Sequence, residues 1–177
     1  LALGVGLGGD GRYGAMLHAV NHSLTKACLF LVAGNVLAAY RTKSALEVRG
    51  MVRVIPWSGV LWVAGFLAIT GSPPFGVFLS ELVILKAALD GGHPLVAVIY
   101  LALLTVIFIG MLAIVLRMAQ PGETPALLPR RTGKREEISA VLPPLALAAT
   151  VLVLGIYVPP ALSALLARAG ESLEMLP

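Results

Sequence analysis

Charged residues are scarce in this sequence. Asp, Glu, Lys and Arg make up 12% of the 177 residues, whereas 58% are hydrophobic and the mean hydropathy is +0.93. Soluble domains carry about 25% charged residues, so this composition excludes an ordinary soluble domain and predicts an integral membrane protein. The net charge is +4, but the basic residues fall in loops between apolar stretches. They are therefore topology signals, and we expect no nucleic-acid partner.

Cysteine is almost absent, and this excludes several kinds of site. The single Cys28 rules out a disulfide within the chain and an iron–sulfur cluster held by the chain alone. A glycine-rich phosphate loop following a strand is also missing, and nothing suggests a site for flavin, nicotinamide or haem. We therefore expect no cofactor, and we expect any redox chemistry to take place in partner subunits.

The amino terminus lacks both an initiator methionine and the pattern of a signal peptide. It begins Leu1-Ala2-Leu3, without a basic region before an apolar core and without a cleavage site. The opening Leu1–Gly8 looks like the end of an apolar segment that starts upstream. We therefore expect this chain to be a piece of a longer polytopic protein.

Long apolar stretches predict an all-α fold. We expect a polytopic bundle of transmembrane helices, with about four spans, one discontinuous helix and an amino-terminal stub. After a turn at Gly8–Gly11, the first full helix is expected over Tyr13–Tyr40, about 42 Å long and able to span a bilayer with tilt. The remaining spans are expected over Val54–Leu89, interrupted at Gly71–Gly76, then over Pro94–Met118 and Ile138–Tyr157, before an amphipathic or irregular tail at 158–177.

Two basic regions indicate the topology. Four Arg or Lys residues fall within Arg41–Arg53, and five fall in the region 117–137: Arg117, Arg130, Arg131, Lys134 and Arg135. Positively charged loops tend to lie on the cytoplasmic side. Two crossings between these regions return the chain to the same side, so the interrupted stretch is expected to be one broken span and not a hairpin. Asp10, the turn at Asp90–His93 and the tail are then expected on the outer side.

A polar stripe runs along the first helix. His18, His22 and Lys26 are spaced i, i+4 and i+8 within an apolar segment. An imidazole can accept a proton at one nitrogen and donate one from the other, and an amine removed from water releases its proton more readily. These properties suit a proton relay. The alternatives are that the groups only hydrogen-bond to neighbouring helices, or that His18 lies in water at the membrane edge.

The two histidines also have a spacing found in metal sites. A metalloprotease helix would require a Glu directly after His18, and no cysteine lies near these residues to complete a set of ligands. We therefore expect no metal at this position.

The second group of functional candidates is the break in the next span. Pro73 and Pro74 remove two backbone donors and leave carbonyl groups without partners inside the helix. Unwound backbone at membrane depth requires protein or a water-filled cavity around it, and transporters use such breaks in ion paths. Glu81 follows Gly76 within the second half-helix, where a carboxyl group must be paired or protonated. We expect a role in ion movement; a hinge with a salt-bridged Glu81 is the alternative.

Two runs of residues resemble a known family. Leu17-His18-Ala19-Val20-Asn21-His22-Ser23-Leu24-Thr25-Lys26-Ala27-Cys28-Leu29-Phe30-Leu31 is similar to the antiporter-like membrane subunits of respiratory complex I and related hydrogenases. Gly71-Ser72-Pro73-Pro74-Phe75-Gly76-Val77-Phe78-Leu79-Ser80-Glu81 resembles their carboxyl-terminal broken helix. The residues of these two runs are most similar to those of the hydrogenase-4 (formate hydrogenlyase) component F family. The resemblance covers about residues 1–118 and is weak beyond Ala119.

The resemblance implies roles for the candidate residues. Lys26 falls on the central lysine of a second half-channel, with His22 and His18 as relay groups, and Glu81 falls on the terminal ionisable residue, where some relatives carry lysine. Residues 1–157 would then form the carboxyl-terminal half-repeat of the module, and the first half-repeat is absent from this sequence.

The implied function is ion translocation in a multisubunit oxidoreductase or hydrogenase of a bacterial or archaeal cytoplasmic membrane. Protons or Na⁺ would move through this chain, and other membrane subunits, peripheral redox subunits and the lipid bilayer would be its partners. The alternatives are a subunit of a multisubunit Na⁺/H⁺ antiporter, which shares the same module, and a purely structural membrane anchor.

Overall fold

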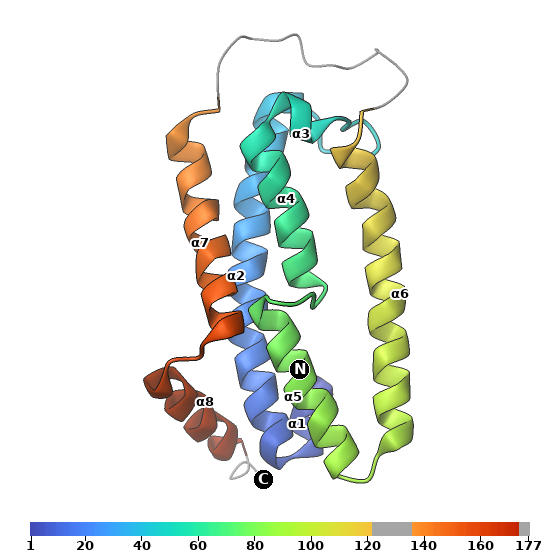
Figure 1. Cartoon of the computed structure of the whole chain (residues 1–177), viewed down its shortest axis with the longest axis vertical. Helices are drawn as coiled ribbons and strands as arrows, with labels where there is room; N and C mark the ends of the chain where they lie inside the picture. The colour runs from blue at the N-terminus through green and yellow to red at the C-terminus, as the bar shows by residue number, and fades with distance from the viewer. Residues whose placement is uncertain (122–135, 174–177) are drawn as a thin grey trace.

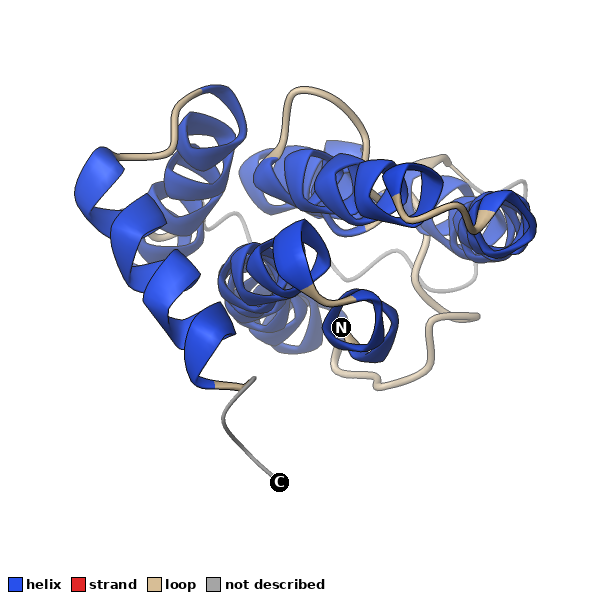
Figure 2. Cartoon of the chain, turned by 90° about the horizontal axis from the view of Figure 1, so that it is seen from below, coloured by secondary structure: helices blue, strands red, loops and turns tan. Residues whose placement is uncertain are grey.

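The structure, a computed structural model, describes residues 1–121 and 136–173. Every regular element within these ranges is a helix, as Figure 2 shows. Four of the expected basic loop residues, Arg130, Arg131, Lys134 and Arg135, lie outside the described ranges. The all-α fold is therefore confirmed for the described part of the chain.

The amino-terminal segment differs from the expectation in one detail. The short helix α1 (Ala2–Leu7) is followed almost at once by α2 (Gly9–Tyr40), which begins four residues before the expected start at Tyr13. Gly8 alone separates the two helices, with a φ of 74° that favours glycine. The expected turn at Gly8–Gly11 is wrong beyond Gly8, because one residue suffices to change the direction of the chain.

The interrupted stretch is a single broken span. A one-turn helix α3 (Met51–Val54) leads into α4 (Pro56–Ile69), and α5 (Gly76–Asp90) begins after the break, which we define as residues 70–75. Figure 1 shows α4 in the upper half of the molecule and α5 continuing through the lower half. The structure therefore agrees with one crossing and not with a hairpin.

Three helices are long and apolar enough to cross a membrane by themselves: α2, α6 (Pro94–Ala119) and α7 (Ile138–Ile156). The tail forms α8 (Pro160–Ser172), which lies across one side of the bundle, tilted against the long helices (Figure 2). The long helix α2 contacts α1, α4, α5, α7 and α8, whereas α6 packs on α4 and α5. The broken span therefore lies between α2 and α6.

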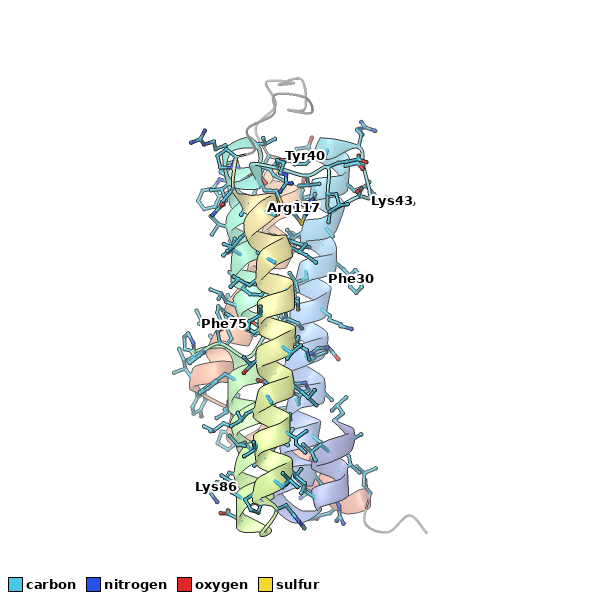
Figure 3. The ribbon with its side chains drawn as sticks, turned by 90° about the vertical axis from the view of Figure 1, so that its right-hand side faces the viewer. Phe30, Tyr40, Lys43, Phe75, Lys86 and Arg117 are labelled. Atoms are coloured by element: carbon cyan, nitrogen blue, oxygen red, sulfur yellow. The ribbon has the colours of Figure 1, made fainter. Side chains whose placement is uncertain are left out.

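Basic residues gather at one end of the bundle. Lys43 and Arg117 lie there beside Tyr40, and Lys86 lies at the opposite end (Figure 3). Arg49 donates to the carbonyl oxygen of Arg117 over 3.0 Å, which joins the loop after α2 to the end of α6. The prediction that the two basic regions share one side is confirmed for the described residues.

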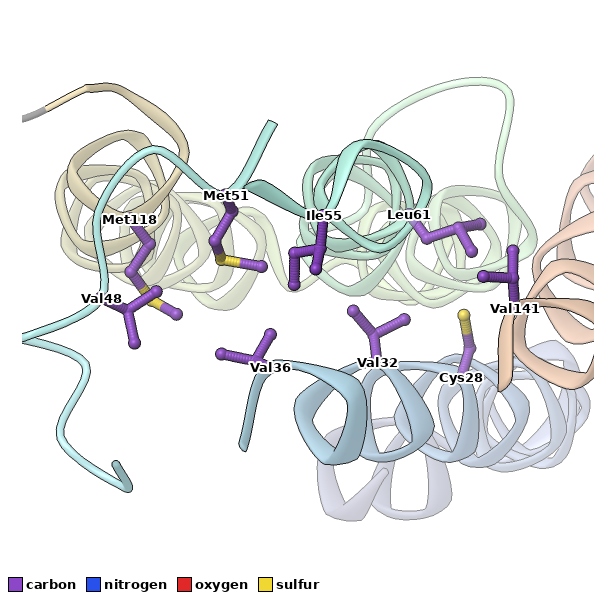
Figure 4. Packing of buried hydrophobic residues seen from close by; sticks show 9 residues of the cluster. All are labelled: Cys28, Val32, Val36, Val48, Met51, Ile55, Leu61, Met118 and Val141. Atoms are coloured by element: carbon purple, nitrogen blue, oxygen red, sulfur yellow. The ribbon is translucent and has the colours of Figure 1, made fainter. Parts of the chain in front are cut away.

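An apolar core fills the basic end of the bundle. Cys28, Val32 and Val36 on α2 face side chains from the broken span, the loop before it, α6 and α7 (Figure 4). The other buried members are Val48, Met51, Ile55, Leu61, Met118 and Val141. This apolar core therefore lies between the loop after α2 and the histidines of α2.

Polar groups tie α7 to its neighbours beside this core. The Asn35 amide donates to the carbonyl oxygen of Ala140 and to the hydroxyl of Ser58, each over 3.0 Å. Glu136 accepts from the backbone N–H groups of Trp57 and Ser58 at 2.8 and 3.0 Å. A carboxylate at the amino-terminal end of a helix is favourable because of the helix dipole, so Glu136 caps and stabilises the first turn of α4.

Candidate ion-translocation site

His18 and His22 lie one turn apart on α2 and contact each other. Their ring centroids are 5.3 Å apart and the ring planes differ by 24°, so the imidazoles are stacked. Both side chains are partly buried. The sequence therefore places two imidazole rings side by side within the half of the molecule where α2 packs on α5.

A hydrogen bond from α5 orients the first of these rings. The Nδ1 atom of His18 lies 3.0 Å from the hydroxyl oxygen of Ser80, and that hydroxyl donates to the carbonyl oxygen of Val77 over 2.7 Å. A serine has one proton to donate, so its oxygen must accept from His18 Nδ1–H. The neutral ring is then held with Nε2 free to accept a proton.

Two buried polar atoms at the histidines lack a hydrogen-bonding partner in the part of the chain that the structure describes. Asn21 is fully buried, and its Nδ2 donates to the carbonyl oxygen of Gly76 over 3.0 Å. Among the residues that the structure describes, neither the Oδ1 atom of Asn21 nor the Nδ1 atom of His22 has a hydrogen-bonding partner. Such groups are costly unless water or another group satisfies them.

Lys26 does not share the buried environment of the histidines. Its side chain is exposed on the outer face of α2, near Phe30, which is 73% exposed. Each step of four residues rotates a helical position by about 40°, so Lys26 lies about 80° around the helix from His18. The three residues form a spiralling stripe that leaves α5 and reaches a surface that no other described helix covers.

Glu81 lies on another side of α5, against the break. Its carboxylate rests on Gly71, whose φ of 67° belongs to the left-handed region. The backbone conformation favours glycine there, and a Cβ atom at Gly71 would displace the Glu81 carboxylate from its position. Ser80 and Glu81 are adjacent residues, yet one faces the histidines and the other faces away from them.

A pocket of about 310 Å³ opens beside Glu81. Thr70–Pro73 of the break form one wall, and Tyr100 and Thr105 of α6 lie across from them. The structure therefore does not bring all four sequence candidates together. His18 and His22 lie between α2 and α5, Lys26 faces outward, and Glu81 faces a pocket between α5 and α6.

The other side of the break is tightly covered. A Cβ atom on Gly76 would collide with the Asn21 amide, and one on Gly155 near the end of α7 would overlap the backbone of Pro74, Phe75 and Gly76. Of the break-forming residues proposed from sequence, Pro74 and Gly76 thus lie where α2, α5 and α7 meet, and Pro73 lines the pocket on the other side of the break. Sequence reasoning did not select Asn21, Ser80 or Gly155 for the site.

The acidic and histidine side chains do not assemble into a metal site in the described ranges. No group of three or more His, Cys, Asp or Glu residues with suitable placement occurs there.

A family match covers the part of the chain that contains both the histidine stripe and the helix break. The sequence profile of the family described as the membrane region of NADH:quinone oxidoreductase and Mrp antiporter subunits matches residues 1–112. The chain belongs to this family. A hydrogenase-4 component F homolog of Methylacidiphilum infernorum is 34% identical over 160 residues, which are 90% of this chain and 32% of that protein. The chain thus spans about a third of this relative's length.

Two further matches come from related complexes. The NADH-quinone oxidoreductase subunit L of Mycobacterium tuberculosis is 36% identical over 93 residues, 52% of this chain and 15% of that protein. A chain in the structure of the Mrp complex from a Dietzia species superimposes with a TM-score of 0.70 at 22% identity, covering 96% of this chain and 39% of that chain. This likeness shows the fold, and the chain is an integral membrane member of the family.

Proposed function

We propose that this chain is part of an ion-translocating membrane subunit of a multisubunit complex. In the proposal, Lys26, His22, His18 and Glu81 carry protons or Na⁺ through the bilayer. One observation carries it: a broken membrane helix presents polar residues to two sides, with Ser80 bonded to His18 and Glu81 lining a pocket. Helices broken at membrane depth are used by transporters to place ion sites.

The histidine pair supplies the middle of the proposed route. His18 donates through Nδ1 and can accept through Nε2, and His22 is stacked on it with a centroid separation of 5.3 Å. A proton taken up by one ring therefore has a second acceptor nearby. Asn21 contributes a buried carbonyl oxygen beside the rings that has no hydrogen-bonding partner in the described ranges.

Lys26 requires a cover that the described helices do not supply. An ammonium facing the centre of a bilayer costs roughly 2.5–3.5 kcal/mol on insertion scales. In the proposal, the outer face of α2 around Lys26 is covered by further helices of the same subunit or of a neighbouring membrane subunit. Those helices would complete the route on the Lys26 side.

The proposed partners also include peripheral redox subunits that drive ion movement. The names of two relatives, a hydrogenase-4 component F homolog and an NADH-quinone oxidoreductase subunit L, favour this arrangement. The second candidate is a Na⁺/H⁺ antiporter complex, which is favoured by a Staphylococcus epidermidis Na⁺/H⁺ antiporter subunit A1 that is 25% identical over 160 residues. Ion movement that requires an electron donor supports the first candidate, and movement driven by an imposed gradient alone supports the second.

The test uses the intact complex in proteoliposomes. We expect Lys26→Ala and Glu81→Ala to reduce ion uptake by about 10²-fold or more, because positioned proton-transfer groups typically contribute that much. Subunit content should remain unchanged. Lys86→Ala is the matched control, since Lys86 donates to Asp90 at the outer end of α5.

Normal ion uptake in both variants would overturn the proposal. A purely structural anchor makes a different prediction: Glu81→Gln would leave activity and coupling intact.

A further inference from the structure

We propose that the outward-facing side of α4, at the basic end of the bundle, binds the head group and one acyl chain of an anionic phospholipid. We call this surface the α4 stripe. It consists of Arg53 in the last turn of α3 and of Trp57, Val60 and Leu67 on α4. The inference goes beyond the proposed function and does not depend on ion movement. Its support comes from the order of side chains along the stripe, from the residues that α4 turns inward, and from cations without acidic partners.

The α4 stripe runs from a charged to an aromatic to aliphatic side chains, in the order in which a phospholipid presents its parts. Arg53 and Leu67 are exposed, and Trp57 and Val60 are 64% and 56% exposed. Positions 57, 60 and 67 fall within about 80° of each other around a helix, so they share one side of α4. Tryptophan is typical of the membrane interface, and the aliphatic residues follow it towards the helix break.

The length of the stripe matches one leaflet of a bilayer. Helical positions 57 and 67 are separated by about 15 Å along the helix axis. The hydrocarbon core of a bilayer is about 30 Å thick, so each leaflet contributes about half of that. Leu67 lies near the end of α4 at Ile69, and Figure 1 shows α4 within the upper half of the molecule. An acyl chain that starts beside Trp57 would therefore reach the level of the break.

The residues that α4 turns inward favour a lipid over another protein helix as the occupant of the stripe. Helix–helix interfaces in membranes are enriched in small residues, which let two backbones approach closely. The serine and both glycines of α4, Ser58, Gly59 and Gly65, are buried. A Cβ atom on Gly59 would press on the backbone of Val52, and one on Gly65 would press on the side chain of Leu29. The close-packing positions of α4 are therefore used within the chain, and the stripe carries only bulky side chains.

The cations at this end of the bundle lack acidic partners. Lys86 at the opposite end pairs with Asp90, whereas no carboxylate in the described ranges forms an ion pair with Arg53, or with Arg117 at the end of α6 (Figure 3). Glu136, beside the start of α4, accepts instead from two backbone N–H groups. Guanidinium groups bind phosphate well, and basic clusters next to membrane spans attract anionic lipids. The phosphate of an anionic lipid can therefore supply the missing negative charge.

Photocrosslinking from the stripe tests the proposal. The complex containing this subunit carries the substitution Val60→p-benzoylphenylalanine and is reconstituted in vesicles of equal parts phosphatidylglycerol and phosphatidylethanolamine. Mass spectrometry identifies the adducts after irradiation. We expect lipid adducts in which phosphatidylglycerol exceeds phosphatidylethanolamine about fivefold or more. Adding Arg53→Gln should lower this preference about fivefold, which is the effect expected of one basic residue near an anionic surface.

Two controls accompany the experiment. Lys86→Gln, at the opposite end of the bundle, should leave the lipid preference unchanged. The same probe in place of Ile99, an exposed position on α6, should give adducts in the ratio of the vesicle lipids. Equal labelling of the two lipids from position 60, or a preference that Arg53→Gln leaves unchanged, would overturn the proposed site. A protein adduct from position 60 would also overturn it, because the stripe would then be an interface with another subunit.

Discussion

Two proline pairs lie within the apolar spans of this chain, and only one of them interrupts its helix. At Pro73–Pro74 the helix stops, and residues 70–75 separate α4 from α5. At Pro143–Pro144 the helix α7 continues through both prolines, from Ile138 to Ile156. Because the two pairs are chemically identical, the difference must come from their neighbours.

At the second pair, another helix replaces what the proline removes. Pro144 cannot donate to the carbonyl oxygen of Ala140, and the Asn35 amide donates to that oxygen instead over 3.0 Å. Both prolines lie inside α7, beyond the first four residues whose N–H groups have no intrahelical acceptor. A donor from α2 thus allows the helix to continue.

At the first pair, the neighbours favour an unwound backbone. Gly71 adopts a φ of 67°, which ends the helical path before the prolines are reached. Gly76 and Gly155 then let α2 and α7 approach the unwound segment closely. A proline pair therefore predicts a break when glycines accompany it, and a continuous helix when a side chain elsewhere satisfies the freed carbonyl.

The largest effect should come from filling the space at the first pair. In Gly155→Ala the new Cβ atom would overlap backbone atoms of Pro74, Phe75 and Gly76, which cannot move aside as a side chain can. We expect a loss of about 3 kcal/mol in the free energy of unfolding, at the upper end for overpacking. Thermal unfolding in detergent measures it.

Gly110→Ala is the control for this prediction, because nothing lies within 4 Å of a Cβ atom built on Gly110. Equal stability of the two variants would show that α7 does not press on the break.

The next effect should come from removing the donor at the second pair. Asn35→Ala removes the hydrogen bonds to the exposed carbonyl oxygen of Ala140 and to the hydroxyl of Ser58, and we expect a loss of about 0.5–1.5 kcal/mol in the free energy of unfolding. Thr150→Ala serves as the control, since Thr150 is exposed and donates only to the carbonyl oxygen of Ala146 on its own helix. An Asn35→Ala variant as stable as the control would contradict our account of the continuous helix.

The smallest effect is expected from replacing Pro144, and this substitution tests most directly why the two proline pairs differ. Pro144→Ala restores a backbone donor for Ala140, so we expect the free energy of unfolding to change by less than about 1 kcal/mol. In the Pro144→Ala variant, Asn35→Ala should lower the free energy of unfolding by less than it does in the wild type. We expect a coupling energy of about 1 kcal/mol in a double-mutant cycle. Additive effects of the two substitutions would mean that Asn35 does not act through this carbonyl.

Much of the fold could be predicted from the sequence, because hydropathy, breakers and loop charge act locally. The span expected over Pro94–Met118 is observed as Pro94–Ala119, and the basic regions favoured one crossing for the broken stretch. The start of α2 could not be predicted, since Gly8, Gly9 and Gly11 all permit a turn and only packing decides which one turns.

The candidate site was harder to predict, because it depends on contacts between distant segments. The i, i+4, i+8 spacing predicted one polar stripe on one face of the helix. His18 and His22 stack on each other, but the rotation of about 40° at each step carries Lys26 to the exposed face. Asn21 and Ser80 acquire their hydrogen-bonding partners only when α2 and α5 pack together. No local pattern signals that Ser80 orients His18 or that the Asn21 amide binds the carbonyl oxygen of Gly76.

The adjacency of Ser80 and Glu81 on α5 has a mechanical consequence. Successive residues on a helix point about 100° apart, so the directions of the serine hydroxyl and the carboxylate are fixed relative to each other by the helix backbone. Any turn of α5 that swung the carboxylate toward the imidazoles would withdraw the serine from His18 in the same movement. Release of the ring and arrival of the acid could not occur independently, because both side chains move with the same helix.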